Sequence, residues 1–213
     1  MKRILIVGGG GFIGTHLTKK LIELGNLVTI LVRDKKKIES LDFMKNVEIV
    51  EGSITDSSLI EKIICGKDYV INLVTVIDNK KIEGIGKESL MVNCFGELNI
   101  LESMRKFNPK CYHIFLGSKA QFGKENKNGE EIKENKKQEP FSFYGIHKQT
   151  CENYIKYYNK LYNLKIALLR VMGVYGPSLI GKPKGIISYF VVNCMNNEKV
   201  NLNEGGLQIN DFI

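Results

Sequence analysis

The chain has 213 residues, of which 43% are hydrophobic and 25% are charged, a length and composition typical of one globular α/β domain with a small extension. No apolar segment approaches the roughly 20 residues that a membrane-spanning helix needs, so no membrane association is expected. The five cysteines are scattered, and the three histidines do not cluster with them. This argues against a disulfide framework and a metal site, and it favours a reducing, cytoplasmic location.

The net charge of +8 comes mostly from lysine and has two interpretations. It could attract anionic partners, nucleic acid among them, or it could belong to a solvated surface. The lysines are dispersed, and no stripe of interleaved basic and aromatic residues is present, so nucleic-acid binding is not expected. A small substrate that carries phosphate groups would suit the charge equally well.

Apolar runs and helix-like segments alternate along the chain. Strands are predicted at residues 2–7, 27–32, 47–50, 69–76, 112–116 and 165–171. Helices are predicted at residues 15–24, 57–65, 89–107, 143–162 and 186–195. This alternation predicts a doubly wound parallel α/β sheet with helices on both faces, whose strand C-termini meet at one edge where ligands bind.

A glycine-rich turn, GGGGFIG at 8–14, joins the first strand to the first helix. Gly8 permits the tight turn, Gly11 lets the backbone approach a pyrophosphate, and Gly14 lets the helix pack close to the strand. The helix N-terminus then offers free N–H groups to phosphates. A turn that binds nothing is the alternative, but the position between a strand and a helix favours nucleotide binding.

Tyr144 and Lys148 lie four residues apart at the start of the predicted helix 143–162, so they share one face. A nearby ammonium would lower the pKa of the phenol, and Tyr144 could then exchange a proton with a carbinol or carbonyl oxygen. Ser118 follows the strand 112–116 at the ligand edge. Its hydroxyl could contact the same substrate oxygen, although its position alone favours a helix cap or turn.

The charged segment 124–139 interrupts the alternation and contains almost no apolar residues. It is predicted to be either a surface loop or a flap beside the site, because Ser118 and Tyr144 flank it.

Four motifs occur in order: the glycine turn, SKAQFG at 118–123, YGIHK at 144–148 and RVMGVYGP at 170–177. Together they strongly resemble the extended short-chain dehydrogenase/reductases, and more narrowly the NAD(P)-dependent nucleotide-sugar epimerase/dehydratase family. The resemblance runs from residue 1 to residue 213. It implies a Rossmann domain at 1–176 that binds NAD(P), and at 177–213 only the beginning of a smaller substrate-binding region.

The resemblance also implies a catalytic site, with Tyr144 as acid/base, Lys148 as its electrostatic partner and ribose ligand, and Ser118 as ligand of the substrate oxygen. Ile54 matches the position that packs on adenine, and Asn93 one that supports the site. The implied cofactor contacts are Gly8, Gly11, Phe12, Ile13, Gly14, Arg33, Ile54, Leu73, Val74, Thr75, Tyr144, Lys148, Val171 and Val174. The implied partners are a nucleotide-diphosphate sugar and a second copy of the chain, packed through helices 89–107 and 143–162.

The end of the second strand departs from the family pattern. NAD-preferring members carry an aspartate there, whereas this chain has Val32 followed by Arg33. The loss of a carboxylate and the gain of cations suit a 2′-phosphate, so NADP(H) is favoured. Asp34 is the alternative ribose ligand, and NAD(H) therefore stays open.

Further departures bear on the reaction. Dehydratases of the family carry an acidic pair after the site Ser/Thr, but Lys119 and Ala120 follow Ser118, so 4,6-dehydration is not expected. Gly173 replaces an asparagine that contacts substrate in many members. The final residues, DFI at 211–213, match a point at which family members continue. We expect an epimerase or a 4-keto reductase that moves hydride between the sugar and nicotinamide C4; the alternative is a non-catalytic NAD(P)-binding sensor or scaffold.

Overall fold

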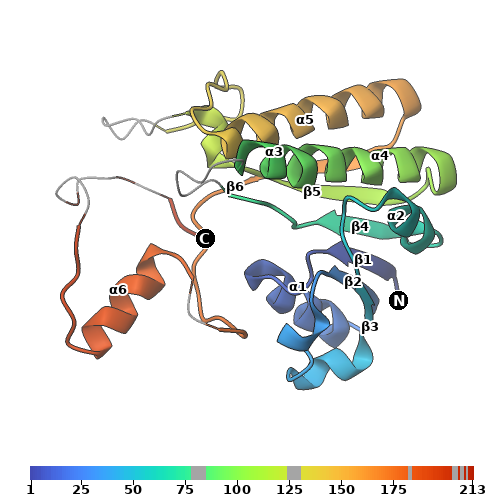
Figure 1. Cartoon of the computed structure of the whole chain (residues 1–213). Coiled ribbons are helices and arrows are strands. Elements are labelled where there is room, and N and C mark those ends of the chain that lie inside the picture. The colour runs from blue at the N-terminus through green and yellow to red at the C-terminus, as the bar shows by residue number, and fades with distance from the viewer. Residues whose placement is uncertain (78–84, 124–130, 182–183, 203–205, 207–208, 210) are drawn as a thin grey trace.

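Six parallel strands form the central sheet of the computed structural model, in the order β3-β2-β1-β4-β5-β6 (Figure 1). The strands are β1 (Arg3–Val7), β2 (Leu27–Val32), β3 (Glu48–Glu51), β4 (Tyr69–Asn72), β5 (Tyr112–Ser118) and β6 (Lys165–Val171). The structure describes residues 1–77, 85–123, 131–181, 184–202, 206, 209 and 211–213. This strand order is that of the doubly wound Rossmann fold, so the predicted fold class is confirmed.

Helices cover both faces of the sheet. They are α1 (Phe12–Glu23), α2 (Ser57–Ile64), α3 (Ile85–Ser89), α4 (Gly96–Phe107), α5 (Phe143–Tyr162) and α6 (Ile186–Met195). Short 3₁₀ turns occupy η1 (Lys35–Lys37), η2 (Asp42–Asn46) and η4 (Lys119–Phe122). A π-helical segment, η3 (Leu90–Phe95), connects α3 to α4, so the helix predicted at 89–107 begins four residues earlier and contains an irregular turn. No helix in these described ranges is long and apolar enough to cross a membrane.

The strands are apolar on both sides because each face packs against a separate hydrophobic cluster. Val70 and Phe115 belong to the cluster under α2, α4 and α5, while Ile6 and Ile30 belong to the cluster beneath α1 and the 3₁₀ turns. Figure 1 shows α4 and α5 side by side on one face, α1 on the other, and α6 away from the sheet.

The strand predicted at 69–76 is wrong beyond Asn72. The Val74 N–H donates to Asn72 Oδ1 at 3.0 Å, and the Val76 N–H donates to Asn93 Oδ1 at 2.8 Å. The Asn93 amide returns a bond to the Val76 carbonyl at 2.9 Å. Side chains therefore take hydrogen bonds that a strand would give to a neighbouring strand, and an apolar run cannot reveal this.

The last residues pair with the segment that follows β6. An isolated parallel bridge joins Gly173 to Phe212, and the Tyr175 N–H donates to the Ile213 carbonyl at 3.1 Å. A Cβ atom at Gly173 would lie 2.9 Å from the Phe212 ring. The glycine that replaces the family's asparagine thus permits this close approach.

Candidate active site

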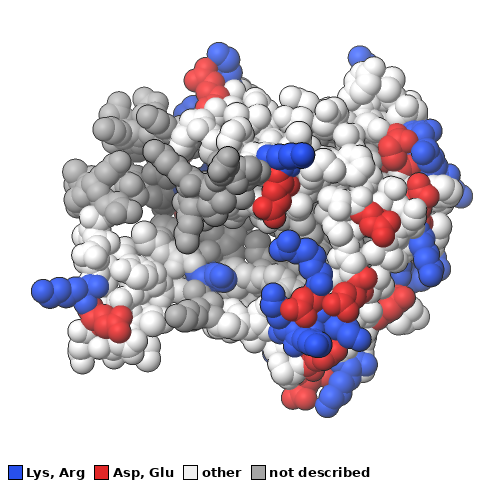
Figure 2. All heavy atoms as spheres, viewed as in Figure 1, with Lys and Arg blue, Asp and Glu red and all other residues white. Residues whose placement is uncertain are grey.

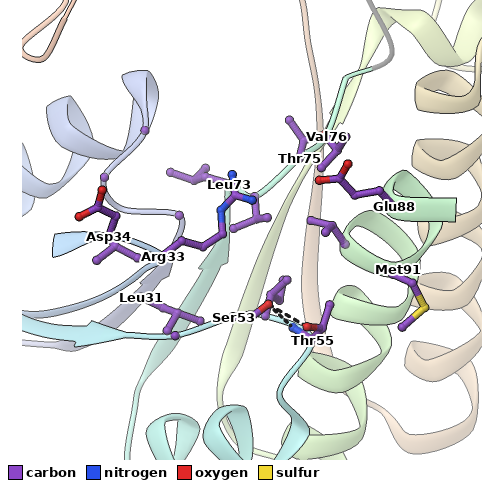
Figure 3. Close-up of a pocket in the computed structure, with 18 of the residues that line it drawn as sticks. Leu31, Arg33, Asp34, Ser53, Thr55, Leu73, Thr75, Val76, Glu88 and Met91 are labelled. Atoms are coloured by element: carbon purple, nitrogen blue, oxygen red, sulfur yellow. Dashed lines mark hydrogen bonds between the residues drawn. The ribbon is translucent and has the colours of Figure 1, made fainter. Parts of the chain in front are cut away.

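A cavity of about 490 Å³ lies at the carboxyl edge of the sheet, beside the junction of β1 and β4 where the strand order reverses (Figure 3). In open α/β sheets this crevice is the usual ligand site. The cavity is lined by Gly8, Gly10, Gly11, Leu31, Val32, Arg33, Asp34, Lys37, Gly52, Ser53, Ile54, Thr55, Leu73, Val74, Thr75, Val76, Glu88, Met91 and Val92.

Half of the predicted cofactor contacts line this cavity. These seven are Gly8, Gly11, Arg33, Ile54, Leu73, Val74 and Thr75. Thr55, Val76, Glu88, Met91 and Val92 also line it, and the sequence interpretation missed them. No local motif marks these five, because they reach the cavity from separate elements: Glu88 from α3, Met91 and Val92 from η3, and Thr55 and Val76 from the segments after β3 and β4.

The backbone at the glycine turn suits a pyrophosphate. Gly8 has φ +89°, a conformation that strains other residues, and a Cβ atom at Gly14 would collide with the backbone of Gly8 and Gly9. Gly11 caps α1 without a side chain, and the first turn of α1 contains no acidic residue. The positive end of the helix dipole therefore faces no carboxylate from its own first turn.

The opposite wall offers an unused polar atom. Within the described ranges, Thr75 Oγ1 is one of two buried side-chain oxygens or nitrogens without a hydrogen-bond partner. Buried hydroxyls are normally paired, so Thr75 keeps an unused hydrogen-bonding group beside the cavity. Together with the glycine turn, it fits the ribose and pyrophosphate of a dinucleotide.

Cations gather at the end of the cavity formed by β2 and η1. Figure 3 shows Arg33 reaching across the cavity towards Leu73. Both oxygens of the Asp34 carboxylate have partners within η1. Oδ1 accepts from the Lys36 N–H at 3.1 Å, and Oδ2 lies 3.5 Å from Lys37 Nζ. The carboxylate that could hold a ribose thus serves as the cap of η1.

The structure brings Ser118, Tyr144 and Lys148 together at the junction of β5 and α5. Ser142 caps α5 by accepting from the Gly145 N–H at 3.1 Å, which fixes where the helix begins. Ser118 does two things: it caps η4, accepting from the Ala120 N–H at 3.2 Å, and it hydrogen-bonds Tyr144. The cap or turn expected for Ser118 is thus confirmed, while its contact with a substrate oxygen stays a prediction.

Lys148 lies behind Tyr144 and is buried. Its Nζ donates to the Leu116 carbonyl at 2.6 Å and sits 4.6 Å from the centre of the Phe115 ring and 5.9 Å from that of Tyr144. The pKa of Tyr144 is raised by burial, and the Ser118 hydrogen bond offsets part of this. The expected lowering by Lys148 is therefore wrong for this structure, since the ammonium is directed at a backbone carbonyl.

The remaining predicted contacts lie outside the cavity lining. Val171 is the register partner of Ser118 across β5 and β6. His16 Nε2 contacts the Pro177 carbonyl at 2.8 Å and thereby draws the segment after β6, which contains Val174, towards α1. The first residues of α1, FIG at 12–14, form its N-terminal turn.

The segment before α5 is tied to the site by a buried ionic cluster. Glu152 accepts from Arg170 at 2.6 Å, from Lys156 at 2.6 Å and from Gln121 at 2.8 Å. Gln138 joins Glu152 at 3.1 Å. Gln138 thus anchors the end of the predicted loop or flap at 124–139 to α5, while residues 124–130 lie outside the described residues.

A sequence profile described as the NAD dependent epimerase/dehydratase family matches residues 4–213. The chain belongs to this family. A family relative from Methanocaldococcus jannaschii, provisionally named UDP-glucose 4-epimerase, is 32% identical over 99% of this chain and 68% of its own. The UDP-glucuronate 4-epimerase 2 of Arabidopsis thaliana is 27% identical over 95% of this chain and 48% of its own. The chain thus spans about half to two thirds of these relatives.

Solved structures of the family superpose closely. The UDP-glucose 4-epimerase of Thermotoga maritima with UDP-glucose gives a TM-score of 0.83 at 29% identity, over 99% of this chain and 69% of that one. The dTDP-glucose 4,6-dehydratase of Bacillus anthracis in complex with NAD gives a TM-score of 0.85 at 22% identity, over 100% of this chain and 67% of that one. At this identity the likeness supports the shared fold and nothing more specific. These neighbours are enzymes that act on nucleotide sugars.

Proposed function

We propose that this chain binds a nicotinamide dinucleotide and carries the catalytic centre of an epimerase or 4-keto reductase for nucleotide-diphosphate sugars. The observation that carries the proposal is the contact of Tyr144 with Ser118, with the buried Lys148 behind the ring. This group lies at the same sheet edge as the cavity that fits a dinucleotide. The names of the relatives support a nucleotide sugar as substrate.

Each residue has a proposed role. A bound dinucleotide supplies a hydride acceptor and donor at nicotinamide C4. Tyr144 exchanges the proton of the sugar hydroxyl, and Ser118 hydrogen-bonds the same oxygen. Lys148 supplies the positive charge that stabilises the phenolate once its ammonium turns from the Leu116 carbonyl to the ribose and the ring. Burial raises the pKa of Tyr144, so the phenol needs these contacts before it can release its proton.

We propose NADP(H) as the preferred cofactor. Arg33 and Lys37 line the cavity, and Asp34 is held by η1. At this end of the cavity Lys37 is paired with Asp34, and the Arg33 guanidinium beside this pair favours a 2′-phosphate over a bare ribose hydroxyl. Neighbours of the same fold are solved with NAD, so NAD(H) is the competing ligand in the test.

The proposed division of the chain places the cofactor domain at 1–176 and the start of a substrate-binding region at 177–213. The proposed partner is a second copy, packed through α4 and α5. Exposed apolar side chains on the outer face of α5 support this, with Tyr154, Tyr157 and Leu161 at helical spacing.

The test combines cofactor identification with product analysis. Purified protein is denatured, released dinucleotide is identified, and fresh protein is incubated with UDP-glucose or with a nucleotide 4-keto sugar and NADPH. The proposal expects a C4 epimer in the first reaction or oxidation of NADPH in the second. Dinucleotide binding with neither reaction would overturn the catalytic proposal and favour a sensor or scaffold.

A further inference from the structure

A fully buried ion pair lies beneath the cavity and is not part of the catalytic group. Glu97 of α4 and His113 of β5 both have zero exposure, and Glu97 Oε1 lies 2.6 Å from His113 Nε2. His113 Nδ1 lies 3.1 Å from the Val70 carbonyl, which only accepts, so Nδ1 carries a proton. Although burial alone would raise the pKa of Glu97, His113 and the other partners lower it, and the carboxylate is charged.

Stability alone does not explain why an ion pair occupies this position in the core. Apolar residues of similar volume usually serve a core as well as a buried ion pair, because removing two charges from water is expensive. The surrounding cluster is apolar, with Val70, Phe115 and Leu101. The hydrogen bond of the second Glu97 oxygen indicates a role for the pair.

Glu97 Oε2 accepts from Asn72 Nδ2 at 2.7 Å, and Asn72 Oδ1 accepts from the Val74 N–H at 3.0 Å. Asn72 therefore has one usable orientation, because its amide nitrogen must face the carboxylate and its oxygen must face the backbone N–H. His113 fixes Glu97, Glu97 fixes Asn72, and Asn72 fixes the Val74 amide at the end of β4.

Val74 forms part of the cavity wall that stands against the glycine turn. A Cβ atom at Gly8 would lie 2.9 Å from Val74 Cγ2 and 3.1 Å from the Val74 nitrogen. The segment that contains Val74 follows the end of β4 and is no longer part of the sheet. Asn93 holds this segment by two hydrogen bonds to the Val76 backbone. A small rotation of Asn72 would move Val74 relative to Gly8 and change the width of the crevice.

We propose that Glu97 and His113 are positioning residues for the dinucleotide: through Asn72 they hold Val74 at the separation from Gly8 that the cofactor needs. This inference rests on the proposed function for the identity of the ligand. The positioning itself can be measured without any ligand.

The decisive variant is the double substitution Glu97→Leu with His113→Leu, which leaves no unpaired buried charge. Because Asn72 loses its acceptor, we expect the Val74 amide to exchange its hydrogen about tenfold faster and the Kd for NADPH to rise about tenfold. No buried charge is left unpaired, so the Tm should fall only by the cost of the unpaired Asn72 amide and Val70 carbonyl. Amide exchange is followed by NMR, and affinity by NADPH fluorescence.

Two controls separate positioning from general stability. Glu97→Gln can accept from Asn72 and donate to neutral His113, so affinity and Val74 exchange should match the wild type. Met104→Ala removes a fully buried side chain from the same helix and should lower the Tm while leaving the affinity of the folded protein unchanged.

Wild-type exchange at Val74 in the double variant would overturn the positioning role, whatever the protein binds. An equal loss of affinity in Met104→Ala would overturn it too, since that loss reports destabilisation. If the wild-type protein binds neither NADPH nor NADH, the proposed function fails and so does the cofactor part of this inference, while the exchange measurement still tests the hold on Val74.

Discussion

At the scale of single residues, the candidate site depends on how the Tyr144 hydroxyl is surrounded. Ser118 reaches it from the end of β5, and Lys148 is held close by the turn of α5. The Lys148 ammonium contacts the Phe115 ring and the Leu116 carbonyl. Burial lowers the pKa of this ammonium. The proposed mechanism requires this ammonium to turn from the Leu116 carbonyl towards the ribose and the Tyr144 ring.

Tyr144→Phe should abolish turnover, because it removes the only proton that the ring can exchange. Dinucleotide affinity should stay nearly unchanged, since the ring and its packing remain. Steady-state kinetics and NADPH titration check the two expectations separately. Activity near the wild-type level would refute the acid/base role.

Arg33→Ala should weaken NADPH binding by roughly 10- to 100-fold and NADH binding far less, because a charged hydrogen bond to the 2′-phosphate is lost. Lys36→Ala is the matched control, since Lys36 is a neighbouring exposed cation outside the cavity lining. Competition titrations with both dinucleotides give the ratio. An equal loss for NADPH and NADH would refute the preference for NADP(H).

At the scale of elements, α5 does more than carry Tyr144. Its buried Glu152 joins β6 through Arg170 and the segment before the helix through Gln138. Burial alone would raise the pKa of Glu152, but Arg170, Lys156 and Gln121 lower it to about 2. Glu152 thereby links α5 both to β6 and to the segment that precedes the helix.

The stability that comes from ionised Glu152 has a defined pH dependence. Its folded pKa of about 2 lies below the ordinary value of 4.5, so this stability is fully present above pH 4.5 and is lost as the pH falls through 2. Glu152→Gln should be less stable at pH 7, since Arg170 loses its carboxylate partner. Between pH 5 and pH 2 the free energy of unfolding of the wild type should fall by up to about 3 kcal/mol more than that of Glu152→Gln.

Urea unfolding at several pH values measures this difference. Glu139→Gln is the control, because the Glu139 carboxylate is solvent-exposed beside Lys137 and should change the pH dependence very little. Parallel pH curves for the wild type and Glu152→Gln would contradict the assignment.

At the scale of the whole molecule, charge is distributed without a dominant patch on the face shown in Figure 2, where basic and acidic side chains are interspersed. Apolar exposure is instead concentrated on helices, with Tyr157 at 59% and Leu161 at 50% on α5. Such a stripe is suited to burial against a matching helix, which is the basis of the proposed dimer.

Tyr157→Glu combined with Leu161→Glu should convert a dimer into a monomer, because two carboxylates would be buried at the centre of the interface. Lys19→Glu on α1, on the opposite face of the sheet, should leave the dimer intact. Sedimentation velocity distinguishes the species. A monomeric wild-type protein at high concentration would rule out the dimer.

Local sequence patterns were sufficient for most of the strands, the helices α5 and α6 and the glycine turn, whereas the Ser118, Tyr144 and Lys148 group was expected from the family resemblance. These features arise from hydrogen bonding and side-chain periodicity within short segments, which neighbouring residues dictate. The order of motifs also identified the family. The bounds of β2, β6, α5 and α6 agree with the predicted ones for the same reason.

Only the tertiary structure decided where β4 ends, how the Lys148 ammonium points and which residues complete the cavity. Asn72, Glu97 and His113 are distant in sequence, and nothing in their local patterns shows that they meet. Their hydrogen bonds exist because α4 and β5 pack against β4 and exclude water, and a buried polar group must then find its partner wherever the fold brings one.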